Sequence, residues 1–310
     1  MSMTNKSKKG FTTFKVSSYI FSYSFLLYPI ILFIIFYVYV NINSIILAFQ
    51  NITLEGQRSW VGFENFKMFL KGLTESGLIR ISFFNSIKIY FINLVICMPL
   101  YIVFSWLLFK KVFGSPVIRI VIMLPSIISS FVFCLVFRSF AGAPLQQFMI
   151  GLGAENFPNL VDDSNYALGT TIFYQIWISF STSLIVYPNA MRSIDPALFE
   201  SGRIDGMCTM WQELRYIILP LIFPTVSTFL IVGFSGMFSG AGPLVAFYMY
   251  SAPAQAYTMG YYILVETLAK ASNPTGYPQI AAGGLMLTMI MAPLTLLLRH
   301  ILEKVSPVEE

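Results

Sequence analysis

The sequence has few of the residues that most often carry catalysis or bind metals. It contains one histidine and three cysteines in 310 residues, too few and too scattered for the common zinc-binding spacings. It also lacks the Gly-x-x-x-x-Gly-Lys-Ser/Thr motif, so it offers no phosphate loop for a nucleotide. Nucleophile motifs are absent as well. These absences argue against an enzyme and predict that no cofactor or metal binds to this chain itself.

Charged residues are rare too, at 11%, where an average soluble domain has about a quarter. Hydrophobic residues make up 56% of the chain and aromatic residues 16%. Six apolar blocks are long enough to cross a bilayer core of about 30 Å as helices. They lie at about 17–40, 84–109, 117–137, 167–189, 221–247 and 279–298. The sequence therefore predicts an all-α, polytopic membrane protein with six transmembrane helices.

None of the six blocks contains an aspartate or a glutamate. Carriers driven by a proton or sodium gradient usually keep such a residue within the membrane, where it binds the driving ion. The energy for any transport is therefore expected to come from outside this chain.

The net charge of +5 could indicate an anionic partner such as nucleic acid, but the basic residues lie at the ends of the apolar blocks. Lys6, Lys8, Lys9 and Lys15 precede the first block, and Lys304 follows the last. Because cytoplasmic loops are enriched in Lys and Arg, both termini are expected in the cytoplasm and residues 1–16 form a cytoplasmic tail. Membrane lipid, and not nucleic acid, is the expected surrounding.

The fourth block carries polar and aromatic residues at helical spacing. Thr170, Tyr174, Trp177 and Ser181 fall on one helical face. Aromatic rings pack against sugar rings while hydroxyl groups form hydrogen bonds, so this face is a candidate wall of a substrate path. The alternative, that Tyr174 and Trp177 only pack between helices, stays open.

An amphipathic helix is expected between the first two blocks. Its apolar side chains recur every three or four positions, at Trp60, Phe63, Phe66, Phe69 and Leu73. Such a helix either lies on the membrane surface or docks on a partner.

A compact polar segment separates the fourth and fifth blocks. Asp195 is suited to cap a helix that begins at Pro196. Gly206 can then end that helix in the left-handed conformation, and a second helix is expected to begin near Trp211. The pattern predicts a helix, a turn and another helix, which together form a docking surface.

The order of residues in this segment resembles the EAA loop of ABC importer permeases, in the form of the carbohydrate branch. The matching residues are Pro196, Leu198, Glu200, Ile204-Asp205-Gly206, Trp211-Gln212, Ile218-Leu219-Pro220 and Pro224. Further matches are Trp60 to Phe66, Leu124-Pro125-Ser126 and Gly240-Ala241-Gly242-Pro243. Two departures occur, since Ser201-Gly202 replaces two alanines and Met207 replaces the alanine after Gly206. The chain is similar to the first permease subunit of maltose-type importers.

The resemblance implies a type I importer fold over residues 17–310, with a cytoplasmic coupling loop at 190–220. It implies that a second homologous permease completes the path, that two ATPase subunits or domains bind ATP and Mg, and that an external binding protein delivers a sugar. The residues it assigns to ATPase coupling are Glu200, Ser201, Gly202, Asp205, Gly206, Leu219 and Pro220. The location implied is the cell membrane. A permease for a non-sugar solute, an ion-coupled secondary carrier and a membrane scaffold remain the alternatives.

Replacing Gly206 by valine is expected to uncouple ATP hydrolysis from uptake while the chain still inserts into the membrane. The reason is that a β-branched residue resists the positive φ required of Gly206. Uptake and ATPase activity measured together in membrane vesicles would check this. Full uptake by G206V would contradict it.

Overall fold

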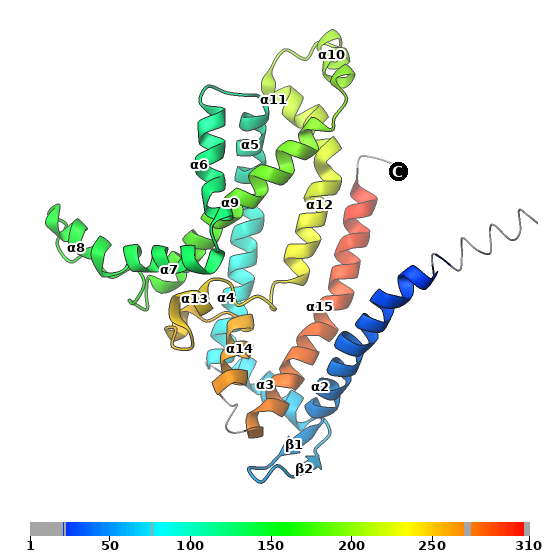
Figure 1. Ribbon diagram of the computed structural model, residues 1–310, viewed down its shortest axis with the longest axis vertical. Coiled ribbons are helices and arrows are strands. Elements are labelled where there is room, and N and C mark those ends of the chain that lie inside the picture. The colour runs from blue at the N-terminus through cyan, green and yellow to red at the C-terminus, as the bar shows by residue number, and fades with distance from the viewer. Residues whose placement is uncertain (1–20, 22, 76, 270–273, 307–310) are drawn as a thin grey trace, which may run out of the picture.

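The protein is almost entirely helical over the residues that the structure describes. The structure is a computed structural model, and it describes residues 21, 23–75, 77–269 and 274–306. A bundle of steep helices occupies its centre, and two helical segments project from that bundle (Figure 1). The expected all-α class is therefore confirmed in its coarse form, with one two-stranded hairpin added.

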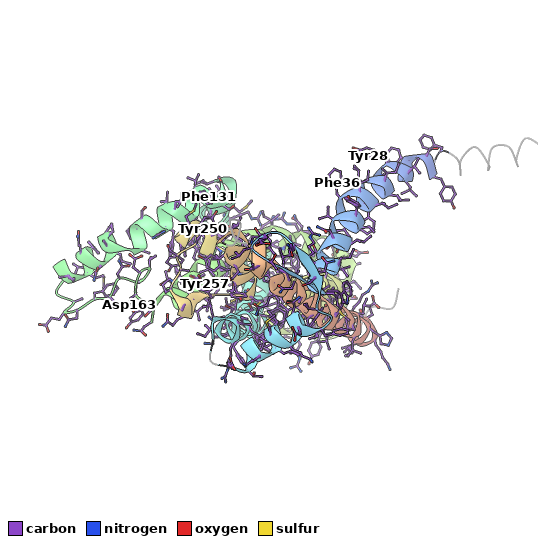
Figure 2. The ribbon with its side chains drawn as sticks, turned by 90° about the horizontal axis from the view of Figure 1, so that it is seen from below. Tyr28, Phe36, Phe131, Asp163, Tyr250 and Tyr257 are labelled. Atoms are coloured by element: carbon purple, nitrogen blue, oxygen red, sulfur yellow. The ribbon has the colours of Figure 1, made fainter. Side chains whose placement is uncertain are left out.

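The first described helix projects away from the bundle. It runs unbroken from Tyr23 to Ala48 and includes a π-helical stretch, η1 (Ile34–Tyr39), and α2 (Val40–Ala48). Figure 2 shows Tyr28 and Phe36 along the projecting part, and both side chains are 70% exposed. The expected first block thus continues past residue 40. Its first residues, and the tail at 1–16, lie outside the described part of the chain.

A short hairpin and a helix connect this first helix to the bundle. Strands β1 (Gln50–Ile52) and β2 (Arg58–Trp60) pair antiparallel, and α3 (Glu64–Thr74) follows. The expected amphipathic helix is therefore present, although Trp60 belongs to the hairpin. Its Phe69 side chain is 1% exposed and packs on the last helix of the chain. Helix α3 is thus docked on its own chain.

The bundle and its connections contain the remaining helices. These are α4 (Leu78–Ile92), η2 (Asn93–Cys97), α5 (Met98–Phe109), α6 (Ser115–Ile127), α7 (Ser130–Ala141), α8 (Ala143–Gly151), α9 (Ala167–Arg192), α10 (Pro196–Ile204), α11 (Met210–Glu213), η3 (Leu214–Ile218), α12 (Leu219–Ser235), α13 (Leu244–Tyr248), η4 (Ala254–Ala256), α14 (Met259–Ala269), η5 (Pro274–Gly276) and α15 (Tyr277–Val305). The π-helical stretches η2 and η3, like η1, lie inside otherwise continuous helices.

The third apolar block, 117–137, is not one helix. It breaks at Ile128 and Ser129, whose backbones are extended, and α7 then runs across the direction of α6 (Figure 1). Pro125 lies inside α6, where it removes one backbone donor. The expected single span is therefore wrong in its extent, and the helix ends two residues after Pro125.

The fifth block, 221–247, is also divided. Its helix runs from Met210 to Ser235, and the chain then continues without helix to α13. Gly236, Gly240 and Gly242 favour this ending, since glycine loses the most backbone entropy in a helix. The span thus begins and ends earlier than expected.

Five described helices are long and apolar enough to cross a membrane. They are Tyr23–Ala48, Leu78–Phe109, Ser130–Gly151, Met210–Ser235 and Pro274–Val305. Helix α9, the expected fourth span, has 26 residues, enough for a membrane crossing of about 30 Å, but is more polar. The multi-pass membrane character is confirmed, while the count of six spans is not.

Two buried clusters hold the bundle together. One lies around α14 and includes Phe69, Phe247 and Tyr261. The other joins α5, the end of α9 and the start of α12, and includes Trp106 and Ile218. The two clusters pack different halves of the same bundle.

Gly283→Ala is expected to destabilise the protein by about 1–3 kcal/mol, the usual cost of overpacking. An added Cβ at Gly283 would lie 2.4 Å from the Phe69 ring, which must then move. Gly284→Ala is the matched control, because an added Cβ there meets nothing within 4 Å. Thermal unfolding in detergent measures both variants. Equal midpoints for the two would contradict the prediction.

Candidate functional site

The segment with the EAA-like order forms a capped helix at one end of the molecule. Helix α10 lies at that end, beyond α5 and α12 (Figure 1). Asp195 caps it, since Oδ1 of Asp195 accepts a hydrogen bond from the amide of Ala197 at 2.9 Å. Pro196 occupies the first turn, where no donor is required. The cap expected from the sequence is therefore confirmed.

Helix α10 ends in a Schellman motif. Gly206 has a φ of 93°, and its amide donates to the carbonyl of Arg203 at 3.2 Å. The amide of Met207 donates to the carbonyl of Gly202 at 3.0 Å. Both bonds satisfy carbonyls that a helix end otherwise leaves without partners. Gly206 thus has the left-handed backbone expected of it.

The next helix also begins with a complete cap. Thr209 and Gln212 form a capping box, in which each side chain accepts from the other residue's backbone amide. The helix continues through η3 into α12, where Leu219 and Pro220 form the first residues. Pro220 has no amide to donate to the preceding turn, which accounts for a π-helical stretch immediately before it.

The outer surface of this coupling loop carries both polar and apolar side chains. Glu200, Ser201 and Asp205 are exposed, and Ile204 is 86% exposed. Within the described residues no ion pair joins Glu200 to Arg203. Ser201 donates to the carbonyl of Ala197 at 3.0 Å, inside its own helix. An exposed apolar side chain beside a carboxylate without an ion-pair partner is suited to contact another protein.

The two departures from the family pattern lie against each other. An added Cβ at Gly202 would come within 2.0 Å of the terminal methyl of Met207 and 3.1 Å of Ile217. The absence of a side chain at Gly202 therefore provides the space that Met207 fills. This contact also joins the two ends of the Schellman motif, where an apolar contact is common. Gly202 is thus matched to Met207.

The second feature is a cavity of about 500 Å³ inside the bundle. Helices α4, α5, α9 and α12 line it together with η2 and the non-helical segment 236–243. Its polar side chains are amides, hydroxyls and phenols, and none of its lining residues is charged. They include Asn93, Gln175, Ser179, Thr182, Ser183, Tyr90, Tyr101 and Tyr187. Irregular backbone at membrane depth is tolerated where it lines such a cavity.

None of the four residues expected to line a path faces this cavity. Thr170 donates to the carbonyl of Leu160 at 2.6 Å, and Tyr174 donates to that of Ser130 at 3.3 Å. Ser181 donates to the carbonyl of Ile122 on α6. Trp177 lines a separate, wholly apolar hollow with aromatic residues of α7. The face identified from the sequence thus packs against α6, α7 and the loop before α9.

The cavity is lined by the neighbouring face of the same helix. Thr171, Gln175 and Thr182 follow the expected residues by one position and point about 100° further round the helix. They have the same helical spacing, and Gln175 is an amide in an apolar segment. The amide of Gln175 could have identified this face from the sequence, since polar groups inside a membrane usually face the interior of a bundle.

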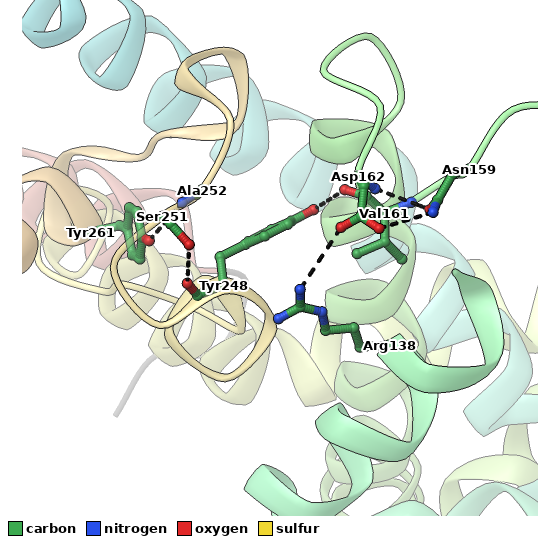
Figure 3. Close-up of polar contacts among 8 residues, drawn as sticks. All are labelled: Arg138, Asn159, Val161, Asp162, Tyr248, Ser251, Ala252 and Tyr261. Carbon is green, nitrogen blue, oxygen red and sulfur yellow. Dashed lines mark hydrogen bonds and ion pairs between the residues drawn. The ribbon is translucent and has the colours of Figure 1, made fainter. Parts of the chain in front are cut away.

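A polar network holds the loop before α9 against α7 and α13 (Figure 3). Tyr248 donates to the carbonyl of Val161 at 2.5 Å, and Arg138 lies 3.8 Å from Asp162 and over the Tyr248 ring. Burial, followed by the nearby Asp162 carboxylate, raises the pKa of Tyr248 to about 12. Its hydroxyl therefore remains a donor at neutral pH, and the loop before α9 stays attached to α13.

No family model matches the chain, but its fold has solved counterparts. It superposes on a chain of the crystal structure of a bacterial alginate ABC transporter in complex with an alginate pentasaccharide-bound periplasmic protein, with a TM-score of 0.79. The match has 20% sequence identity and covers 96% of this chain and 98% of that one. The fold is that of an ABC importer permease.

Curated relatives narrow the class. The permease MsmF of the multiple sugar-binding transport system of Streptococcus mutans is 23% identical over 270 residues, covering 86% of this chain and 91% of MsmF. The galactooligosaccharide permease GanP of Bacillus subtilis is 28% identical over 150 residues, 44% of this chain. That alignment spans only about a third of GanP, 34% of its length. These similarities support the resemblance indicated by the coupling loop: the relatives are permeases of sugar transport systems, which are transport components.

Exchanging Gly202 and Met207 for alanine is expected to give non-additive effects. Either single change disturbs the contact between them, while G202A/M207A gives both positions the alanine of the family pattern. The interaction energy between contacting residues is about 0.5–3 kcal/mol. Titration of the permease with its ATPase in detergent, for both single variants and the double variant, measures it. Strictly additive changes in affinity would contradict the contact.

Proposed function

We propose that this chain is one permease subunit of an ATP-driven importer and forms half of the path for a sugar or oligosaccharide. The observation that carries the proposal is that one bundle joins an exposed, doubly capped coupling loop to an uncharged polar cavity. The loop receives energy and the cavity receives the solute. Hydroxyl, amide and aromatic groups are the partners that a neutral polyol requires.

The proposed partners bind at the coupling loop and at the cavity. Two ATPase subunits, which bind ATP and Mg, dock on this coupling loop and on that of a second homologous permease. Glu200, Ser201, Gly202, Asp205 and Gly206 form the contact, and Leu219 and Pro220 begin the span behind it. A second permease supplies the other half of the cavity. An external binding protein delivers the sugar on the side of the molecule facing away from α10.

The proposed membrane arrangement has six spans. The third crossing begins with α6, whose 13 residues reach only about 20 Å, and is completed by the segment that follows it. Helix α9 and the helices that end at residues 48, 109, 235 and 305 make the other five, and α9 packs along α5 and α6. The C-terminal end of α15 lies toward the same side of the molecule as α10 (Figure 1). With the ATPases on that side, the C-terminus is cytoplasmic, and an even number of spans brings the N-terminus to the cytoplasm as well.

The test is to purify the complete complex through a tag on this chain and to reconstitute it in liposomes. ATPase activity is then measured with maltotriose, galactotriose, raffinose and an oligogalacturonide, each with the co-purified binding protein. We expect at least one of these to stimulate hydrolysis and to accumulate inside. Uptake that is independent of ATP but follows an ion gradient would overturn the proposal.

Gln175→Leu is expected to raise the KM for the stimulating sugar about fivefold, because one hydrogen bond contributes about 1 kcal/mol. Trp177→Leu on the same helix is the matched control, since Trp177 lines the apolar hollow and not the cavity. Sugar-dependent ATPase activity measures both variants. A larger effect of W177L would place the path on the face first expected from the sequence.

A further inference from the structure

A partly buried ion pair joins the coupling loop to the helix that reaches the cavity. Lys110 follows the last residue of α5, and its Nζ forms an ion pair with Oε1 of Glu213 at the end of α11. The two side chains are only 19% and 13% exposed. Partly buried pairs are screened much less by salt than surface pairs. This contact is therefore a firm attachment between α5 and the segment after α10.

The same lysine also touches the coupling helix. Its Nζ lies 5.7 Å from the ring centroid of Phe199 on α10 and 5.9 Å from that of Phe109. The Phe109 and Phe199 rings pack together, with centroids 6.3 Å apart. A cation within about 6 Å of an aromatic face is attracted to it. One ammonium group thus connects α5, α10 and α11.

The buried side of α5 continues from this junction to the cavity. Trp106 precedes Phe109 by three positions on that helix, and Trp106 and Tyr101 are both buried. Trp106 is 3% exposed and packs on Trp211 of α11, with ring centroids 5.2 Å apart. Tyr101 lines the cavity and donates to the carbonyl of Ile176 on α9 at 3.3 Å. Rigid elements in packed contact transmit a displacement, because packed interiors are not readily compressed.

We propose that Lys110, paired with Glu213 and lying against Phe199, is a positioning residue that passes the motion of the coupling helix to α5 and so to the cavity wall. This inference rests on the proposed function, because it requires an ATPase that moves α10. Lys110 touches neither the cavity nor, in this proposal, the sugar. Its effect passes through the orientation of α5.

The experiment measures the accessibility of the cavity wall as well as ATP hydrolysis. Met98 lies on α5 and lines the cavity, so Met98→Cys provides a reporter for a small, charged methanethiosulfonate reagent. Cys208, the exposed cysteine among the three, is replaced by serine, while Cys97 and Cys134 are buried. The complete tagged complex is labelled without nucleotide and after trapping with ATP and vanadate.

We expect trapping to change the labelling rate of the reporter several-fold in the otherwise unmodified complex. In K110M and in E213Q this change is expected to be lost, while ATP hydrolysis continues and the complex remains assembled. The exchanged pair K110E/E213K restores part of the change. Lys111→Met is the matched control, since Lys111 is the next residue, has the same charge and is exposed. It should respond like the unmodified complex.

A purely structural role would instead lower the thermal midpoint and the amount of assembled complex, and the labelling of the assembled fraction would still respond to trapping. That result, or an unchanged response in K110M, overturns the inference and leaves the proposed function intact. An unmodified complex that hydrolyses ATP while its reporter ignores the nucleotide contradicts the proposed function itself.

Discussion

The packing of α5 against α9 is the contact on which the rest of this chain depends. Both helices line the cavity, and both continue to the end of the molecule that carries α10. Tyr101 and Tyr187 belong to the cavity wall and also to the buried cluster beneath the coupling loop. The same side chains thus belong to both places, which is the physical basis of the proposed coupling.

A second constraint comes from the membrane, where backbone groups must find partners within the protein. The chain leaves helical structure at two places within its apolar blocks, near Ile128 and between Gly236 and Pro243. The second place borders the cavity. There the backbone of Gly240 lies very close to Gly260: a Cβ added at Gly260 would lie 2.5 Å from the carbonyl group of Gly240. The glycines therefore shape the cavity wall, whereas regular helix packing alone would not need them in this segment.

The coupling loop differs from the family pattern at two places that contact each other in the structure. Ser201-Gly202 and Met207 look like separate departures in the sequence, and Gly202 by itself suggests a softer helix. In the structure Gly202 and Met207 form one contact, with the Met207 side chain over the glycine. A loss of helix propensity of about 1 kcal/mol at Gly202 is thus accompanied by packing that alanine at 207 would not provide. Gly202 and Met207 thus differ from the family pattern together, while the capped helix and its glycine end keep the expected geometry.

The sequence by itself determined the membrane class, the caps of α10 and the left-handed Gly206, because hydrophobic length and local backbone chemistry act over a few residues. It also drew attention to α9, although the cavity is lined by the neighbouring face of that helix. It could not determine which face of α9 meets α6, since Tyr174 and Gln175 are both polar and only packing chooses between them. The break at Ile128 and the pairing of Lys110 with Glu213 likewise depended on the tertiary structure. A contact between residues a hundred positions apart produces no periodic pattern in the sequence from which it could be predicted. For this reason the coupling loop identified at the outset is confirmed as a shape, and its attachment to the cavity emerged only from the fold.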